Sequence, residues 1–82
     1  MIKETRYSVN KEEFEILREM GFIVDFKMPW HVRVSKEAYQ GFFIDVWPTK
    51  KKYCTNTDGR FSQSNYYKDL SEMIETKFMD RL

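Results

Sequence analysis

The sequence predicts an α+β protein in which an antiparallel sheet of three or four strands carries two helices on one face, in the order α-β-β-β(-β)-α. Hydrophobic residues recur at helical spacing near both ends of the chain and alternate with polar residues in the middle, where turn-forming residues separate the alternating segments. Because 82 residues are too few for two independent cores, we expect a single domain spanning residues 1–82.

The first helix is predicted over residues 11–20. Asn10 is a favourable N-cap, and Glu13 three residues later completes a capping-box pattern. Gly21 is the expected residue after the helix in a Schellman ending, in which Phe22 packs back onto the last turn.

Three strands are predicted in the middle of the chain, at residues 22–27, 30–36 and 42–47. Pro48 ends the third strand, because proline cannot donate a ladder hydrogen bond. The run 52–55 can pair back as a fourth short strand, and residues 56–59 form the next turn, with Gly59 free to adopt a positive φ.

A second helix is predicted from residue 64 onward, with Ser64 or Asn65 as its cap. Its apolar face consists of Tyr66, Leu70, Met73, Ile74 and Phe78. Both helices need an apolar surface, which one face of the sheet supplies.

Alternation divides the strand residues into two faces. The more apolar set, expected under the helices, is Phe22, Val24, Phe26, Trp30, Val32, Val34, Phe42, Ile44 and Val46. The set expected on the open face is Ile23, Asp25, Lys27, His31, Arg33, Ser35, Phe43, Asp45 and Trp47. Aromatic rings among charged groups indicate a binding surface, although each ring is also consistent with packing beneath a neighbouring segment.

Composition excludes several classes of function. No apolar run approaches the roughly 20 residues that cross a bilayer, so no membrane association is expected. One cysteine, Cys54, and one histidine cannot build a zinc site alone, and we expect no metal, no cofactor and a reducing, cytoplasmic location. The net charge of +1 is far from that of a typical electrostatic nucleic-acid binder, so any such role requires a local patch.

His31 is the one residue that suggests catalysis. With Asp45 across the sheet it could act as a general base, but a histidine beside Asp and Arg on a surface is more often a hydrogen-bonded strand residue. Nothing else completes a nucleophile constellation, so the sequence favours a binding protein over an enzyme.

Three lysines, Lys50, Lys51 and Lys52, form the only basic cluster, at the predicted hairpin tip. They could hold phosphates and so bind nucleic acid. They are also consistent with a solvated turn that discourages edge-to-edge strand pairing.

Gly21-Phe22 after a helix, then a strand, then His31 at the start of the next strand resembles HicA-type mRNA-interferase toxins. That resemblance implies a double-stranded-RNA-binding-like fold and a functional histidine at His31. In this chain Pro29-Trp30 stands where the family has Gly-Ser before the histidine.

Asp45-Val-Trp-Pro-Thr49, followed by Lys52-Tyr53 and Gly59-Arg60, is similar to a D-x-W-P-T…K-[WY] motif of small uncharacterised phage proteins. This resemblance implies a phage or mobile-element origin and no particular activity.

The sequence therefore favours a phage-type binding protein that acts stoichiometrically on a host protein or nucleoprotein complex handling nucleic acid, with an anti-CRISPR-like role as one instance. Its expected contact residues are Arg33, Phe43, Asp45, Trp47, Lys50, Lys51 and Lys52. The alternative is a HicA-like RNA-binding module or ribonuclease, in which His31 is the general acid or base. The oligomeric state is left open.

Overall fold

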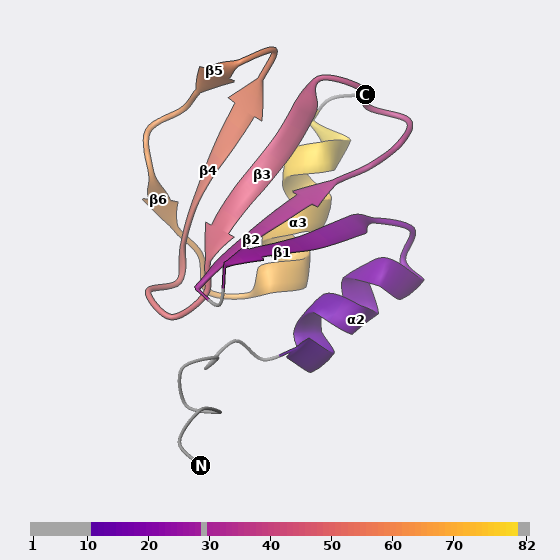
Figure 1. Ribbon diagram of the computed structural model, residues 1–82, viewed down its shortest axis with the longest axis vertical. Coiled ribbons are helices and arrows are strands. Elements are labelled where there is room, and N and C mark those ends of the chain that lie inside the picture. Colours follow the sequence, from indigo (N-terminus) through magenta and orange to yellow (C-terminus); the bar gives the residue numbers. More distant parts are fainter. Residues whose placement is uncertain (1–10, 29, 81–82) are drawn as a thin grey trace.

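The computed structural model describes residues 11–28 and 30–80 of the chain. Their elements, in order, are α2 (Lys11–Glu19), β1 (Ile23–Met28), β2 (His31–Ser35), β3 (Phe42–Trp47), β4 (Lys52–Thr57), β5 (Arg60–Phe61), β6 (Asn65–Tyr66) and α3 (Leu70–Met79) (Figure 1). Strands β1 to β4 pair in sequence order, all antiparallel, and the two short strands β5 and β6 both pair with β4. The predicted α+β class and element order are confirmed, with β5 and β6 as additions.

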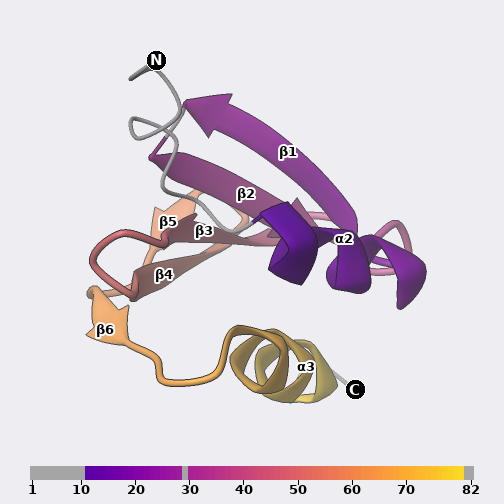
Figure 2. The ribbon, with the colours of Figure 1, turned by 90° about the horizontal axis from the view of Figure 1, so that it is seen from below.

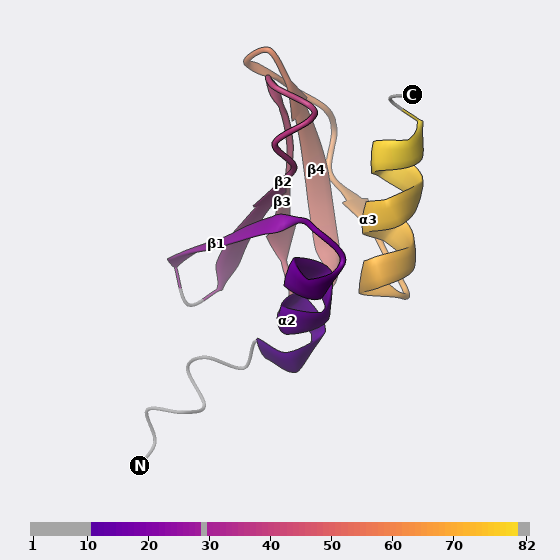
Figure 3. The same cartoon turned by 90° about the vertical axis from the view of Figure 1, so that its right-hand side faces the viewer.

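Both helices pack against the same face of the sheet. Their buried residues, Phe14 and Leu17 of α2 and Leu70, Met73, Ile74 and Phe78 of α3, belong to one core cluster with Val24, Val32, Val34, Phe42, Ile44, Val46 and Tyr53 of the strands. Figure 2 shows the two helices on one side of the curved sheet, and Figure 3 shows α3 running beside it. The predicted two-layer arrangement therefore leaves the opposite sheet face without a helix.

The end of α2 follows the Schellman pattern that the sequence predicts. Phe22 N donates to Leu17 O at 3.0 Å, Gly21 N donates to Arg18 O at 3.0 Å, and Gly21 has a φ of +98°. Phe22 is buried in the core, so the ending directs the chain into β1. The predicted N-cap, Asn10, lies outside the described residues.

The predicted start of the second helix is wrong. Residues 65–66 form β6, and α3 begins at Leu70, where the Asp69 side chain accepts a hydrogen bond from Glu72 N at 3.1 Å. Tyr66, assigned by periodicity to the buried helical stripe, is 73% exposed. Pairing of this segment with β4 outweighs the periodic pattern.

The expected position of Trp30 under the helices is also wrong. Trp30 lies in the turn before β2 and is 52% exposed. In addition, the β1–β2 register shifts between Phe26 and Met28, which brings Met28 opposite His31 on the open face. The β-bulge breaks the period-2 pattern on which the face assignment rested.

The two hairpin turns of β4 are close to the prediction. Lys50 N donates to Trp47 O at 3.1 Å in the β3–β4 turn, where Lys51 has a φ of +53°. In the β4–β5 turn Gly59, with a φ of +87°, donates to the side chain of buried Asn56 at 2.9 Å. The first of these turns places the lysines beside the end of β3.

Candidate functional site

The open face of the sheet is organised around a buried carboxylate. Asp45 points away from the helix-covered core, yet it is only 2% exposed. Its Oδ1 accepts a hydrogen bond from Arg33 Nε at 3.0 Å and lies 2.9 Å from His31 Nε2. Arg33 is directly opposite Asp45 in the β2–β3 register, so strand pairing positions this contact.

Two aromatic rings of β3 flank these polar contacts. The imidazole of His31 stacks on Trp47 with 4.9 Å between ring centroids and 8° between ring planes. The guanidinium of Arg33 lies 3.9 Å from the ring centroid of Phe43. We call these five residues the Asp45 cluster: His31, Arg33, Phe43, Asp45 and Trp47. In this cluster the carboxylate of Asp45 contacts both the imidazole of His31 and the guanidinium of Arg33. The imidazole packs on the ring of Trp47, and the guanidinium packs on the ring of Phe43.

The energetics of the Asp45 cluster differ from those of a solvated surface. Burying a carboxylate is costly unless charged hydrogen bonds replace its water, and His31 and Arg33 supply them. Removing one member of such a buried pair typically costs about 3–5 kcal/mol. By contrast, the Lys27–Asp25 pair on the same face is exposed and contributes little.

The Asp45 contact also sets the chemistry available to His31. In the tautomer whose Nε2–H donates to Asp45 Oδ1, Nδ1 is the ring nitrogen left to accept a proton. The side chain of His31 is 21% exposed, so part of it reaches solvent. This arrangement could orient a general base, or it could simply fix the ring.

Cys54 lies directly opposite Asp45 on β4 and is buried on the same face. Burial raises the pKa of the Cys54 thiol, the negative charge of Asp45 raises it further, and the charge of Arg33 opposes both effects. The thiol is therefore held in its neutral form, as expected for a small apolar residue in this position.

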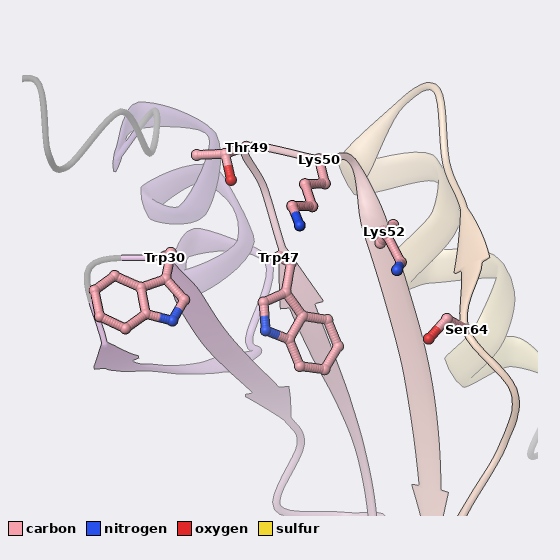
Figure 4. Close-up of a pocket in the computed structure, with 6 residues that line it drawn as sticks. All are labelled: Trp30, Trp47, Thr49, Lys50, Lys52 and Ser64. Atoms are coloured by element: carbon pink, nitrogen blue, oxygen red, sulfur yellow. The ribbon is translucent and has the colours of Figure 1, made fainter.

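A pocket of about 390 Å³ adjoins the Asp45 cluster at Trp47. Its lining residues are Trp30, Trp47, Thr49, Lys50, Lys52 and Ser64. In the view of Figure 4, Trp47 lies between Trp30 and Lys52, and the Lys50 side chain lies next to Trp47. We call this the Trp30–Trp47 pocket.

The structure thus places the predicted contact residues in two adjoining groups. Arg33, Phe43, Asp45 and Trp47 form one group with His31, and Lys50 and Lys52 join Trp47 in the pocket. Lys51 is exposed at the hairpin tip and does not line the pocket.

Sequence reasoning missed the contributions of Trp30, Thr49 and Ser64 to this surface. Pro29 was the available signal for Trp30, because a residue next to an interrupting proline cannot be placed by strand alternation. No sequence signal links Ser64 to the pocket, since its position depends on the pairing of β6 with β4.

Within residues 11–28 and 30–80, no group of three or more His, Cys, Asp or Glu side chains is placed to hold a metal ion. The helices of this described part also lack the length and apolar character needed to cross a bilayer. In comparisons with known proteins, no family model, no curated protein and no solved structure matches the chain.

Proposed function

We propose that the protein is a phage-type binding module that acts stoichiometrically, and that the open face of its sheet contacts a host protein or nucleoprotein complex that handles nucleic acid. The Asp45 cluster carries this proposal. A carboxylate 2% exposed fixes two polar side chains and two rings on a face that neither helix covers.

Fixing side chains in advance favours binding. Long side chains such as arginine lose rotamer freedom when a partner orders them, and a contact already held in the free protein avoids that loss. Here the guanidinium of Arg33 is held by two contacts, the hydrogen bond from Nε to Asp45 and the packing on the ring of Phe43. Trp and Arg are also the residue types that contribute most to protein interfaces.

The surroundings of the Asp45 cluster are apolar as well as charged. Ile23 and Met28 of β1 are each 50% exposed and lie opposite Ser35 and His31 of β2, on the same open face. Together with the exposed ring of Trp30 they extend the apolar part of the surface toward the edge of the sheet. Such a patch, rimmed by charged side chains, is typical of an interaction surface.

The proposal is tested by affinity capture from a nuclease-treated bacterial host lysate, quantified by mass spectrometry. Phe43→Ala/Trp47→Ala removes the two rings of the cluster and should abolish capture of specific partners while thermal unfolding stays cooperative. The matched control, Ile16→Ala/Met79→Ala, removes exposed apolar area from the helices, where these residues are 51% and 64% exposed. Equal capture by wild type and the ring variant, or equal loss in the control, contradicts the proposed surface.

A second candidate function, a HicA-like RNA-binding module or ribonuclease, is favoured by one observation. His31 Nε2 lies 2.9 Å from Asp45 Oδ1, and a partly exposed imidazole that is oriented by a carboxylate can act as a general base. The Asp45 cluster would then hold the catalytic histidine, with Arg33 and the lysines contacting phosphates.

Expression in bacteria separates the two functions. A ribonuclease should arrest growth and cleave cellular RNA, and His31→Ala should relieve both effects while the chain remains folded by circular dichroism. If the wild-type protein leaves growth and RNA intact, the ribonuclease function is wrong and the binding function stands on the capture experiment.

A further inference from the structure

We infer that the Trp30–Trp47 pocket is a binding site for a nucleotide of single-stranded nucleic acid, with the base against the indoles and the phosphate at Lys50 and Lys52. This inference rests on the proposed function, since it assigns a ligand to part of the open face. The pocket volume of about 390 Å³ lies in the lower range of small-molecule sites, which run from about 300 to 1,000 Å³, and suits a ligand the size of one nucleotide.

The aromatic part of the pocket is suited to an unpaired base. Trp47 is stacked on His31, so its plane is fixed. Trp30 lines the same pocket and is 52% exposed, so its ring is accessible to a ligand. Successive indoles on a fixed platform are the feature by which proteins bind single strands without reading their sequence.

The polar part of the pocket is suited to a phosphate. The side chains of Lys50 and Lys52 both line it, with the hydroxyls of Thr49 and Ser64. No carboxylate contributes to the lining, and in the described part of the chain neither lysine forms a salt bridge; Lys52 Nζ lies 5.9 Å from the ring centroid of Tyr66. Two ammonium groups without acidic partners in the described part of the chain would attract an anion such as a phosphate.

The near-neutral net charge conceals a separation of charge. Carboxylates are concentrated on the helices, as Glu12, Glu13, Glu15 and Glu19 in α2 and Glu72 and Glu75 in α3. On the open face, Asp45 is bound to Arg33 and His31, and Asp25 is paired with Lys27. The carboxylates of Asp25 and Asp45 on the open face are therefore already paired with basic groups, which leaves Lys50 and Lys52 available to attract an anion.

Two features favour a single strand over a duplex. Indoles can stack only on bases that are not already stacked and paired. Two lysines also neutralise too few phosphates to hold a duplex by charge alone. If both contact the strand, log Kd should depend on log salt with a slope of about 1.4 in magnitude, about 0.7 for each single-strand phosphate.

The test uses the intrinsic fluorescence of the full chain, because its two tryptophans are the two that line the pocket. Titration with a ten-residue oligo-uridylate, and separately with oligo-thymidylate, should quench tryptophan emission. Uridine monophosphate and inorganic phosphate are added in parallel. Quenching by the oligonucleotides with the expected salt slope supports the site. Quenching by neither oligonucleotide at low salt overturns it.

Variants locate the binding. By anisotropy of a labelled oligo-uridylate, Trp30→Ala should weaken binding by roughly 5- to 150-fold, the range for loss of one stacked base. Lys50→Gln/Lys52→Gln should weaken it at least tenfold and flatten the salt dependence. The charge-matched control, Lys36→Gln/Lys77→Gln, removes two lysines that lie outside the pocket and should bind like wild type. Equal affinity in all variants overturns the site.

The outcome is separable from that of the host-capture experiment. Host capture that depends on Phe43 and Trp47, combined with no oligonucleotide binding, overturns the nucleotide site and leaves the proposed protein contact standing. Oligonucleotide binding that depends on Trp30, combined with no specific host capture, supports the nucleotide site and overturns the proposed protein partner.

Discussion

The indole of Trp47 lies parallel to the imidazole of His31, with 4.9 Å between ring centroids and 8° between ring planes. Asp45 holds the imidazole through Nε2 from the same strand that carries Trp47. The indole is therefore oriented by a histidine on a neighbouring strand, which is itself oriented by a carboxylate two residues before the indole. A substitution at Asp45 should therefore alter the orientation of the Trp47 indole.

Asp45→Asn should lower the free energy of unfolding by about 1–3 kcal/mol, because it removes the charge from hydrogen bonds to His31 and Arg33. The near-ultraviolet circular dichroism of the tryptophans should change as well. Urea unfolding monitored by far-ultraviolet dichroism measures the first effect. Asp25→Asn is the matched control, since its pair with Lys27 is exposed and should be worth no more than about 1 kcal/mol. Equal unfolding midpoints for the two variants would show that the buried contacts contribute nothing.

The reactivity of Cys54 should respond to its two charged neighbours in opposite directions. Asp45 raises the pKa of the thiol and Arg33 lowers it. Asp45→Asn should therefore increase, and Arg33→Gln decrease, the rate of reaction with a disulfide reagent at pH 8, because the thiolate is the reacting form. If local unfolding controls access instead, both variants should react faster than wild type.

Tyr67 should ionise at a higher pH than an ordinary tyrosine. Burial and, to a smaller extent, the negative charge of Glu13 together raise the pKa of Tyr67 to about 12. Absorbance titration at 295 nm should show one ionisation at high pH that is absent from Tyr67→Phe. Glu13→Gln should bring the pKa of Tyr67 partly back toward the ordinary value for tyrosine. Tyr66→Phe, at a position 73% exposed, should leave the late transition unchanged.

The same shift makes stability depend on alkaline pH. Because the pKa of Tyr67 is higher in the folded than in the unfolded chain, its contribution is fully present below about pH 10 and is lost as the pH rises through about 12. Between pH 8 and pH 11, the free energy of unfolding measured with urea should fall more for the wild type than for Tyr67→Phe. Equal falls in the free energy of unfolding would show that Tyr67 does not contribute to the pH dependence.

Asp69 should be the residue that starts the last helix. Asp69→Ala should lower the free energy of unfolding by about 1 kcal/mol, since its side chain accepts from Glu72 N at 3.1 Å. Asn65→Ala should have a much smaller effect, although the sequence pattern makes Asn65 an equally good cap. A larger loss for Asn65→Ala than for Asp69→Ala would mean that the helix begins earlier than Leu70.

The fold could be predicted where local chemistry and tertiary packing agree. The ending of α2 is an example, because Gly21 and Phe22 satisfy a local hydrogen-bond pattern and bury a ring together. The prediction was wrong where the secondary structure of a segment depends on pairing with a strand elsewhere in the chain. Tyr66 has helical spacing to Leu70, but the backbone of its segment pairs with β4.

The candidate site was predictable in part for the same reason. Alternation and antiparallel pairing were enough to bring His31, Arg33 and Asp45 to one face. Nothing in the sequence indicates that Asp45 is almost fully buried there, because that depends on how the neighbouring side chains fold over it. Nor could alternation place Trp30, since the register shift lies between Phe26 and Met28 and a turn follows.

That register shift has a consequence for self-association. Within the described part of the chain β1 is the outermost of the long strands, and an unpaired strand edge can recruit a second chain by backbone pairing. The register shift leaves Lys27, which forms an ion pair with Asp25, opposite no residue of β2, and such bulges increase the local twist of a strand. A second copy that paired with β1 would have to match this irregular strand, so the bulge disfavours growth of the sheet by addition of further copies at this edge.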